Sequence, residues 1–261
     1  MAFPYKHVFL VGATSGIGRA MAERLVEEGA RVTAVGRRQD RLDELVRRHG
    51  EGKVQAIPFD IRAQDEIHQL VEDVIKTSPD IDCVFLNAGI QRPFDLTDAA
   101  KFNLDLFHEE ISVNFSSLVF LTHAFLPFFL ARKEESTSFI FTGSNLAIVP
   151  AATLPAYSAS KAALNVFILC LREQLRNSTV RVIEISPPPV QTELHDYMGE
   201  AAGRSLGMPL NDFIDIAYRR LVGGEDQIVV GAVGPTETFH EIIDKRRTAF
   251  TNLAKAMRGD K

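Results

Sequence analysis

The fold of this chain is decided by the stretch Gly12-Ala13-Thr14-Ser15-Gly16-Ile17-Gly18, which joins an apolar run to an amphipathic helical pattern. Glycines at such a turn let the backbone bend tightly and approach a bound group, while free N–H groups at the helix N-terminus attract an anion. The stretch therefore predicts a site for the pyrophosphate of a dinucleotide, and a plain tight turn is the alternative. The predicted contacts are Gly12, Thr14, Ser15, Gly16, Ile17 and Gly18.

Outward from this turn, apolar runs and helical patterns alternate along the whole chain, without a linker or a repeat. The runs are continuously apolar, which is typical of strands in a sheet that is covered on both faces. Parallel strands need crossover helices, so we expect one α/β domain, residues 1–261, with a doubly wound, mostly parallel, seven-stranded sheet. The predicted strands are His7–Val11, Arg31–Val35, Lys53–Pro58, Ile81–Leu86, Ser138–Thr142, Val180–Ile185 and Gln227–Val230. The predicted helices are Gly16–Glu28, Gln39–His49, Gln64–Thr77, Leu104–Ala131, Ala156–Arg176 and Thr236–Met257.

The stretch from Thr192 to Asn211 has no clear period and contains three glycines and a proline. We expect a mobile flap there, over the carboxyl ends of the strands, where ligands of such sheets bind. His195 and Tyr197 lie in this flap and are candidates to meet a substrate, with solvated surface positions as the alternative.

Composition argues against several classes of protein. The 29 Lys and Arg residues and 34 Asp and Glu residues give a net charge of −5, which does not favour nucleic-acid binding. Cys83 and Cys170 lie in apolar runs without ligand spacing, so we expect buried thiols in a reducing compartment, the cytoplasm. The chain does not open like a secretory signal, and the apolar stretch Leu118–Ala131 is too short to span a bilayer. We therefore expect a soluble protein with no membrane partner.

Further motifs accompany the glycine turn at characteristic places. Leu86-Asn87-Ala88-Gly89 ends the fourth predicted strand, Ser144 follows the fifth, and Tyr157 and Lys161 lie four residues apart on the next helix. Together with the G-x-x-x-G-x-G spacing, this combination resembles the short-chain dehydrogenase/reductase family over essentially the whole chain. The resemblance implies a Rossmann fold and a nicotinamide cofactor. Within the family, Asn87-Ala88-Gly89-Ile90-Gln91 and the proline-rich loop after the sixth strand resemble the DltE-like oxidoreductases.

The expected chemistry centres on Tyr157 and Lys161, whose side chains lie one helical turn apart on one face. An ammonium beside a tyrosine favours the phenolate, so we expect Lys161 to lower the tyrosine pKa from about 10 toward neutral pH. The resemblance implies that Tyr157 exchanges a proton with the reacting oxygen, Ser144 hydrogen-bonds that oxygen, and Lys161 holds the nicotinamide ribose. Asn114 matches a family residue that anchors a water relaying protons to Lys161. A polar residue bonded to nearby backbone within a helix irregularity is the alternative.

The end of the second predicted strand bears on the choice of cofactor. A site for NAD(H) has a carboxylate here for the ribose diol, whereas this chain has Arg37 and Arg38 and no acid before Asp40. Two arginines face the positive end of the next helix, and a 2′-phosphate would offset that cost through charge-assisted bonds. We therefore expect NADP(H) to be preferred, with NAD(H) as the alternative. We expect Arg37 to be the stronger phosphate contact, because Arg38 is able to pair with nearby acids instead.

The resemblance also assigns contacts around the rest of the cofactor. For Asp60, a helix N-cap is the alternative. Pro188 replaces a glycine of the family pattern, which removes an N–H, fixes φ near −65° and leaves the loop conformation open. Val11 replaces a threonine, so one hydroxyl contact to the turn after the fourth strand is lost. The matched positions are Asp60 and Ile61 at the adenine, Asn87, Ala88 and Gly89 in the turn after the fourth strand, and Pro187, Val190 and Thr192 beside the nicotinamide.

The sequence predicts an apolar substrate pocket and no metal site. The histidines lack acidic or cysteine partners at ligand spacing, so each is interpreted as a surface or satisfied core residue. The apolar candidates for the pocket suggest a hydrophobic carbonyl compound. These candidates are Leu146, Ile148, Leu194, Met198, Leu206 and Met208, and the histidines are His49, His68, His108, His123 and His240.

The leading hypothesis is an NADP(H)-dependent oxidoreductase that transfers a hydride between nicotinamide and a small carbonyl or secondary alcohol substrate. A catalytically silent NADP(H)-binding sensor or partner-binding protein of the same fold is the alternative, although it would not need Ser144, Tyr157 and Lys161. A nucleotide-sugar epimerase usually has a longer C-terminal substrate domain than the chain after Ser186 provides. The six phenylalanines between Leu104 and Ala131 exceed one core-facing stripe, which predicts a homodimer or homotetramer.

Overall fold

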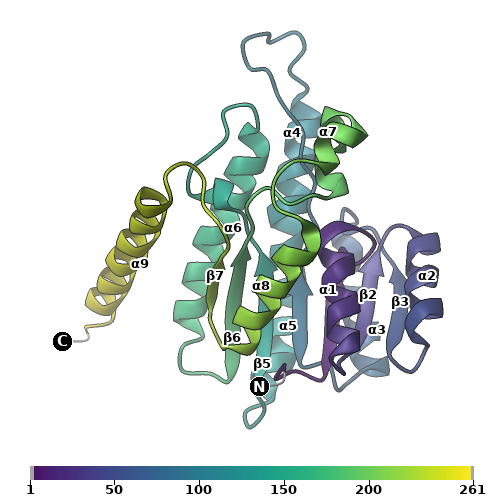
Figure 1. The fold of residues 1–261 in the computed structure, drawn as a ribbon. Helices are drawn as coiled ribbons and strands as arrows, with labels where there is room; N and C mark the ends of the chain where they lie inside the picture. The colour runs from purple at the N-terminus through teal and green to yellow at the C-terminus, as the bar shows by residue number, and fades with distance from the viewer. Residues whose placement is uncertain (1–2, 260–261) are drawn as a thin grey trace.

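The described residues, 3–259 of this computed structural model, form one seven-stranded sheet in the order β3-β2-β1-β4-β5-β6-β7 (Figure 1). Every pairing between neighbouring strands of this sheet is parallel. Successive crossovers run in opposite directions from β1, so a crevice opens beyond the carboxyl ends of β1 and β4. The strands are β1 (His7–Val11), β2 (Arg31–Gly36), β3 (Val54–Pro58), β4 (Cys83–Leu86), β5 (Thr137–Thr142), β6 (Val180–Ser186) and β7 (Gln227–Val229).

Helices cover both faces of the sheet, as the continuously apolar strands require. One face carries α1 (Gly16–Glu27), α2 (Gln39–His49) and α8 (Leu210–Val222). The other carries α3 (Ile67–Thr77), α4 (Leu104–Ile111), α5 (Ser117–Ala131) and α6 (Pro155–Gln174). The last helix, α9 (Thr236–Arg258), follows β7 and runs along the flank of the molecule (Figure 1).

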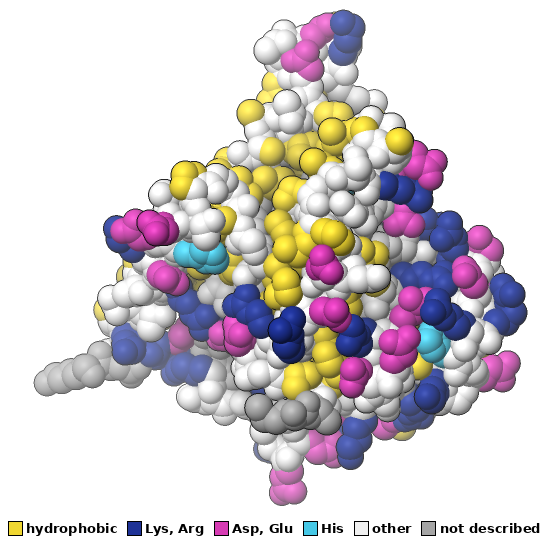
Figure 2. All heavy atoms as spheres, viewed as in Figure 1, with side chains coloured by type: hydrophobic (Ala, Val, Ile, Leu, Met, Phe, Trp, Pro, Cys, Tyr) yellow, Lys and Arg dark blue, Asp and Glu magenta, His cyan; other side chains and the backbone are white. Residues whose placement is uncertain are grey.

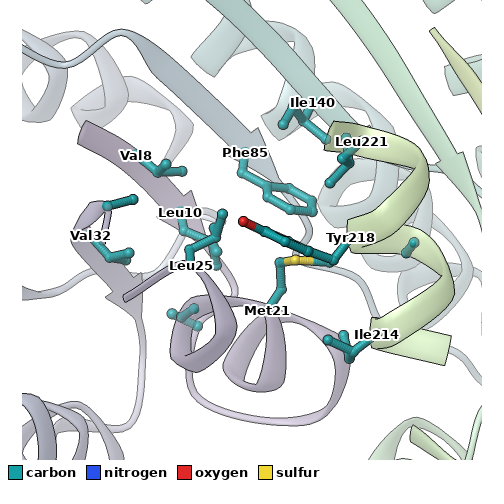
Figure 3. Close-up of a cluster of buried hydrophobic side chains, with 14 of the residues drawn as sticks. Val8, Leu10, Met21, Leu25, Val32, Phe85, Ile140, Ile214, Tyr218 and Leu221 are labelled. Carbon is teal, nitrogen blue, oxygen red and sulfur yellow. The ribbon is translucent and has the colours of Figure 1, made fainter. Parts of the chain in front are cut away.

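Alternation along β1 distributes its side chains between two cores. Val8 and Leu10 point to the face of α1 and α8, while Phe9 and Val11 point to the opposite face. Figure 3 shows Met21 of α1 and Tyr218 of α8 packed over Leu10 in the first core. Since both faces of the strand are buried, a one-residue slip would move every side chain into the opposite core and disrupt the packing of both.

One long helix dominates the second core. From Leu104 to Ala131 the backbone is helical throughout, because the π-helical turn η2 (Ser112–Ser116) joins α4 to α5. By length and hydropathy, this is the one helix among the described residues that would suffice to cross a membrane. We expect the stretch Leu118–Ala131 to be too short for that, but the whole helix, Leu104–Ala131, is long enough. Phe125 and Phe129 are nevertheless fully buried against the sheet, which makes α5 a core helix.

The predicted strands agree with the structure to within two residues, and so do the predicted helices when η1 (Gln64–Glu66) is counted with α3. Residues 192–211, where we expect a flap, contain the 3₁₀ helix η4 (Glu193–Met198) and the short α7 (Glu200–Arg204) before α8 begins at Leu210, and the mobility of this stretch stays a prediction. Helix α8 itself was not predicted. Its buried residues nevertheless recur at the spacing of an amphipathic helix, and they are Phe213, Ile214, Ala217, Tyr218 and Leu221.

Charges of both signs are interspersed over the face that carries α1 and α8 (Figure 2). Many of them are paired, for example Arg19 with Glu23 and Glu44. This mixed surface agrees with the modest net charge of the chain.

We predict that Phe129→Ala destabilises the protein by about 3–5 kcal/mol, the usual cost of truncating a buried phenylalanine. Phe129 is fully buried and its ring packs against Phe125, Phe128 and Phe139. Chemical denaturation followed by circular dichroism measures the change in the free energy of unfolding. Leu253→Ala, at an exposed position of α9, is the control and should change it by less than about 0.5 kcal/mol. Equal effects of the two variants would contradict the assigned core.

Candidate active site

The predicted site residues meet in one cleft of about 510 Å³ at the carboxyl edge of the sheet. Of the twenty predicted positions, Gly18 and Asn114 lie behind the lining rather than in it. The remaining eighteen line the cleft: Gly12, Thr14, Ser15, Gly16, Ile17, Arg37, Arg38, Asp60, Ile61, Asn87, Ala88, Gly89, Ser144, Tyr157, Lys161, Pro187, Val190 and Thr192.

The glycine turn has the close backbone approach that its residues imply. Gly12 has φ +87°, and a Cβ on it would lie 2.8 Å from the Cα and N of Ala88. A Cβ on Gly18 would collide with the Gly12 carbonyl oxygen. The turn is therefore packed against the Asn87–Gly89 segment, and the plain-turn alternative does not explain why both positions exclude a side chain.

The segment after β4 is tied to the glycine turn through Asn87. Its Nδ2 donates to the Gly12 carbonyl oxygen at 3.4 Å, and its Oδ1 accepts from the Thr142 hydroxyl at 2.9 Å. Thr142 ends β5. It thus supplies from the neighbouring strand a hydroxyl contact to this turn, where Val11 has none to offer.

The N-terminus of α1 already holds an anionic group. The backbone N–H of Gly16 donates to Glu193 Oε2 at 3.1 Å, across 177 residues of chain. A carboxylate at this position matches the positive end of the helix, as a pyrophosphate would. The sequence analysis missed Glu193, which follows Thr192 at the start of η4 and also lines the cleft.

The two arginines after β2 play different parts. Arg38 donates to the Thr14 hydroxyl at 2.9 Å and to the Ser15 hydroxyl at 2.5 Å, so it bonds to the glycine turn. The expected pairing of Arg38 with acids of α2 is not seen in the described residues. Arg37 is exposed at the cleft and has no hydrogen bond among residues 3–259. Arg37 is therefore the guanidinium that is available to an added phosphate.

Asp60 faces the cleft and belongs to a chain of ion pairs. It accepts from Arg62 Nε at 2.8 Å, and Arg62 also donates to Glu109 at 2.9 Å. Glu109 in turn pairs with Arg92 at 2.7 Å. The Arg62 contacts hold the pKa of Asp60 below its usual range despite partial burial, which keeps the carboxylate charged. No helix-capping bond from Asp60 to η1 (Gln64–Glu66) is formed; Asp60 instead bonds the Arg62 N–H.

Ser144, Tyr157 and Lys161 come together in the buried wall of the cleft, each no more than 5% exposed. Lys161 Nζ lies 5.7 Å from the centre of the Tyr157 ring and donates to the Thr142 carbonyl oxygen at 2.8 Å. Burial raises the pKa of Tyr157 to about 12, against the opposing effect of the Ser144 hydroxyl, and lowers that of Lys161 to about 8. The expected lowering of the tyrosine pKa by Lys161 is therefore absent, because desolvation dominates both groups.

Asn114 acts as a clamp on the turn after β4. Its Oδ1 accepts from the Ile90 N–H at 2.8 Å, and its Nδ2 donates to the Ile90 carbonyl oxygen at 2.8 Å and to the Ser160 hydroxyl at 3.1 Å. It lies in the π-helical turn η2, the kind of irregularity that recurs at functional sites. These contacts fix the turn after β4, and the role of Asn114 in a proton relay to Lys161 stays a prediction.

The proline-rich loop after β6 is held by a short bridge to the flap. Val190 pairs with Met208, and the Gln191 N–H donates to the Met208 carbonyl oxygen at 3.0 Å. The Pro187 carbonyl oxygen accepts from the Asn145 N–H at 3.1 Å, which fixes the start of the loop. Pro188 therefore sits in an ordered segment that lines the cleft despite the replaced glycine.

The predicted apolar pocket is only partly present. Leu146 and Leu194 line the cleft, but the other four apolar candidates lie outside its lining. Polar residues take part instead, among them Gln91 and His195, whose side chains meet at 3.0 Å. His195 is buried rather than solvated. The candidates outside the lining are Ile148, Met198, Leu206 and Met208.

A metal centre finds no support among the described residues, which contain no group of three histidine, cysteine or acidic side chains that could hold an ion. His68 and His123 do touch, with ring nitrogens 3.2 Å apart, but they lie on the surface of α3 and α5. This contact joins two helices outside the cleft.

Comparisons with known proteins agree with this geometry. The family profile described as short chain dehydrogenase matches residues 6–202. The chain belongs to the short-chain dehydrogenase/reductase family. The uncharacterized oxidoreductase DltE of Bacillus subtilis is 32% identical over 251 residues, covering 96% of this chain and 95% of the relative. This similarity confirms the resemblance to the DltE-like oxidoreductases.

Solved structures of short-chain dehydrogenases share the fold. The closed form of a serine dehydrogenase complexed with NADP+ has a TM-score of 0.77 at 25% identity, covering 88% of this chain and 97% of that chain. A Burkholderia cenocepacia short chain dehydrogenase in complex with NADP has a TM-score of 0.74 at 25% identity, covering 98% of both chains. A 3-ketoacyl-(acyl-carrier-protein) reductase from Brucella melitensis, complexed with NADH, has a TM-score of 0.77 at 21% identity, covering 88% of this chain and 98% of that chain.

The residues of this chain fit a nicotinamide dinucleotide. The glycine turn leaves no room for side chains at Gly12 and Gly18, and the Gly16 N–H at the α1 N-terminus donates to the Glu193 carboxylate, as it would to a pyrophosphate. Arg37, Asp60 and the Asn87–Gly89 segment line the same cleft at the positions matched to the cofactor.

We predict that Glu193→Gln strengthens binding of NADPH and NADH alike. Both cofactors carry a pyrophosphate that competes with the Glu193 carboxylate for the α1 N-terminus, so removing the charge should tighten binding by about 1 kcal/mol, roughly five-fold. Fluorescence titration gives the two dissociation constants. Asp196→Asn is the control, since Asp196 also lies on η4 but pairs with Arg204 of α7 and lies outside the cleft lining. Weaker cofactor binding by Glu193→Gln would contradict the competition.

Proposed function

We propose that this protein is an NADP(H)-dependent oxidoreductase that interconverts a carbonyl compound and a secondary alcohol. The observation that carries the proposal is the placement of Ser144, Tyr157 and Lys161 in the same cleft as the glycine turn. When bound, the nicotinamide supplies or accepts the hydride. Proton transfer and binding of the reacting oxygen depend on side chains of this protein.

Ser144 and Tyr157 are the groups that bind the reacting oxygen. In reduction, the Tyr157 hydroxyl gives its proton to the carbonyl oxygen, and in oxidation the phenolate takes the proton of the alcohol. The Ser144 hydroxyl orients this oxygen and stabilises its developing charge. Lys161, which is buried beside Tyr157, supplies the positive charge that favours the phenolate once the ammonium is released from the Thr142 carbonyl oxygen.

Water exclusion strengthens these interactions. Tyr157 and Lys161 are 5% and 2% exposed, so charge developing at the oxygen is poorly screened by solvent. Burial keeps Tyr157 protonated near neutral pH but also makes it a weaker acid, so proton transfer depends on the positive charge of Lys161 to lower its pKa.

The preference for NADP(H) is supported by charge at the end of β2. Arg37 stands at the cleft where an NAD(H) site has a carboxylate, and no hydrogen bond within the described residues occupies it. Two relatives of known structure at 25% identity were solved with NADP or NADP+. NAD(H) remains the alternative cofactor.

A silent NADP(H)-binding sensor is less well supported than an enzyme. A sensor needs the glycine turn and the arginines, but it has no use for a proton donor and a serine hydroxyl buried beside the nicotinamide position. Screening NADPH oxidation against a panel of aldehydes and ketones tests the proposal directly.

We predict that Tyr157→Phe lowers turnover by about 10²–10⁴-fold, the usual contribution of general acid–base catalysis, without changing the NADPH dissociation constant. The ring and its packing survive, whereas the transferable proton does not. Steady-state kinetics and fluorescence titration measure the two quantities. Tyr218→Phe, in the α8 core away from the cleft, should leave turnover unchanged. Near-native turnover by Tyr157→Phe would contradict the proton transfer assigned to the Tyr157 hydroxyl.

We predict that Arg37→Ala weakens NADPH binding about ten- to hundred-fold, as expected for loss of a hydrogen bond to a charged group, and leaves NADH binding nearly unchanged. Arg38→Ala should weaken both cofactors to a similar degree, because Arg38 holds Thr14 and Ser15 of the shared glycine turn. The dissociation constants of both cofactors for the three proteins provide the check. Equal affinities of the wild type for NADPH and NADH would rule out the assigned preference.

We also propose that the protein is a cytoplasmic homodimer or homotetramer. Phe120 and Leu130 of α5 are 40% and 43% exposed, and Val166 of α6 is 49% exposed, which supports further burial against a second copy. Cys83 and Cys170 are free thiols, as expected in a reducing compartment. We expect a dimeric or larger mass in light scattering at micromolar concentration, and a monomeric mass would contradict the assembly.

A further inference from the structure

Gln91 and His195 form a buried polar pair in the wall of the cleft. His195 Nδ1 lies 3.0 Å from Gln91 Oε1, and the two residues are 6% and 7% exposed, respectively. Gln91 lies in the turn after β4 and His195 lies in η4, so their contact joins this turn to the flap. Both line the cleft together with Ser144 and Tyr157.

Burial of His195 favours the neutral form of its imidazole. Burial lowers the pKa of its imidazole below the ordinary value of 6.5, and the neighbouring Asp196 opposes this only partly. The Asp196 carboxylate is itself paired with Arg204, at 3.2 and 3.1 Å, which limits its effect on the ring. A neutral imidazole has one N–H donor and one nitrogen acceptor.

The pair leaves one donor and one acceptor for a ligand. If Gln91 Oε1 accepts from His195 Nδ1–H, the Gln91 amide group remains as a donor and His195 Nε2 as an acceptor. If the Gln91 amide is flipped, its Nε2 donates to His195 Nδ1. His195 Nε2–H is then the remaining donor and Gln91 Oε1 the remaining acceptor, so the ligand still meets one of each. Neither of the remaining atoms has a hydrogen-bond partner among residues 3–259, and both side chains line the cleft. The two side chains therefore offer both a donor and an acceptor to a ligand in the cleft.

We propose that Gln91 and His195 bind a second hydroxyl group of the substrate. A hydroxyl donates one hydrogen bond and accepts another, whereas an ammonium only donates and a methyl group does neither. The inference rests on the proposed function, in which Ser144 and Tyr157 hold the reacting oxygen. The substrate class is thus a diol or polyol in one direction and a hydroxy-ketone or hydroxy-aldehyde in the other.

The Gln91–His195 pair also disfavours substrates with an apolar group at this position. An alkyl group placed here would leave two buried polar groups without partners, and sites of this kind discriminate strongly against the analogue that lacks the hydroxyl. Gln91 and His195 therefore act as specificity-determining residues, while Leu146 and Leu194 contact the carbon skeleton.

The test uses alcohols that differ only by hydroxyl in place of methyl. Oxidation with NADP⁺ is measured for propane-1,2-diol against butan-2-ol, and for butane-1,3-diol against pentan-2-ol. For at least one pair, kcat/KM of the wild type should favour the diol by about ten- to hundred-fold. The double variant Gln91→Leu/His195→Phe should lose this preference, measured as the ratio of the two kcat/KM values within each pair. Met198→Leu, on the same 3₁₀ helix but outside the cleft lining, should retain the preference.

Three results would overturn the inference. The first is turnover of the mono-alcohols by the wild type with no preference for either diol, and the second is an unchanged diol preference in the double variant. The third is a His195 ring that ¹⁵N NMR shows to be doubly protonated at the assay pH, because it would then offer no acceptor. If no alcohol or carbonyl compound reacts, that result contradicts the proposed function itself. The inferred substrate class is then contradicted as well.

Discussion

The site depends on one close backbone contact, between Gly12 and Ala88. A Cβ on Gly12 would lie 2.8 Å from the Cα and N of Ala88, so no other residue fits without displacing the turn. The contact exists because β1 and β4 are neighbours in the sheet, with Val11 opposite Leu86 at their carboxyl ends. It brings the α1 N-terminus to the Asn87–Gly89 segment, and the cleft forms between them.

Burial then determines the chemistry of the groups around this contact. Tyr157 and Lys161 are shielded from water, which opposes charge on each of them and moves their pKa values in opposite directions. Glu110, buried on α4, has a pKa raised to about 7 by desolvation, and its charge further raises the pKa of Tyr157. The acid–base behaviour of the site therefore reflects the whole buried wall and not the tyrosine–lysine pair alone.

The flap links the two ends of the cleft through short polar contacts. Glu193 binds the glycine turn, and two residues later His195 binds Gln91. Both residues lie on η4, so this one short 3₁₀ helix contacts both the glycine turn and the turn after β4.

The sequence by itself determined the sheet, the glycine turn and eighteen of the residues that line the cleft, because each depends on local pattern. Continuous apolar runs mark buried strands, and Tyr157 and Lys161 lie one helical turn apart in any helix. Only the tertiary structure decided what these groups contact. Arg38 bonds Thr14 rather than a nearby acid, and His195 is buried against Gln91, 104 residues earlier in the chain. Burial and long-range pairing arise from packing between helices and strands that are distant in the sequence. The local sequence pattern therefore does not predict which polar groups will contact each other.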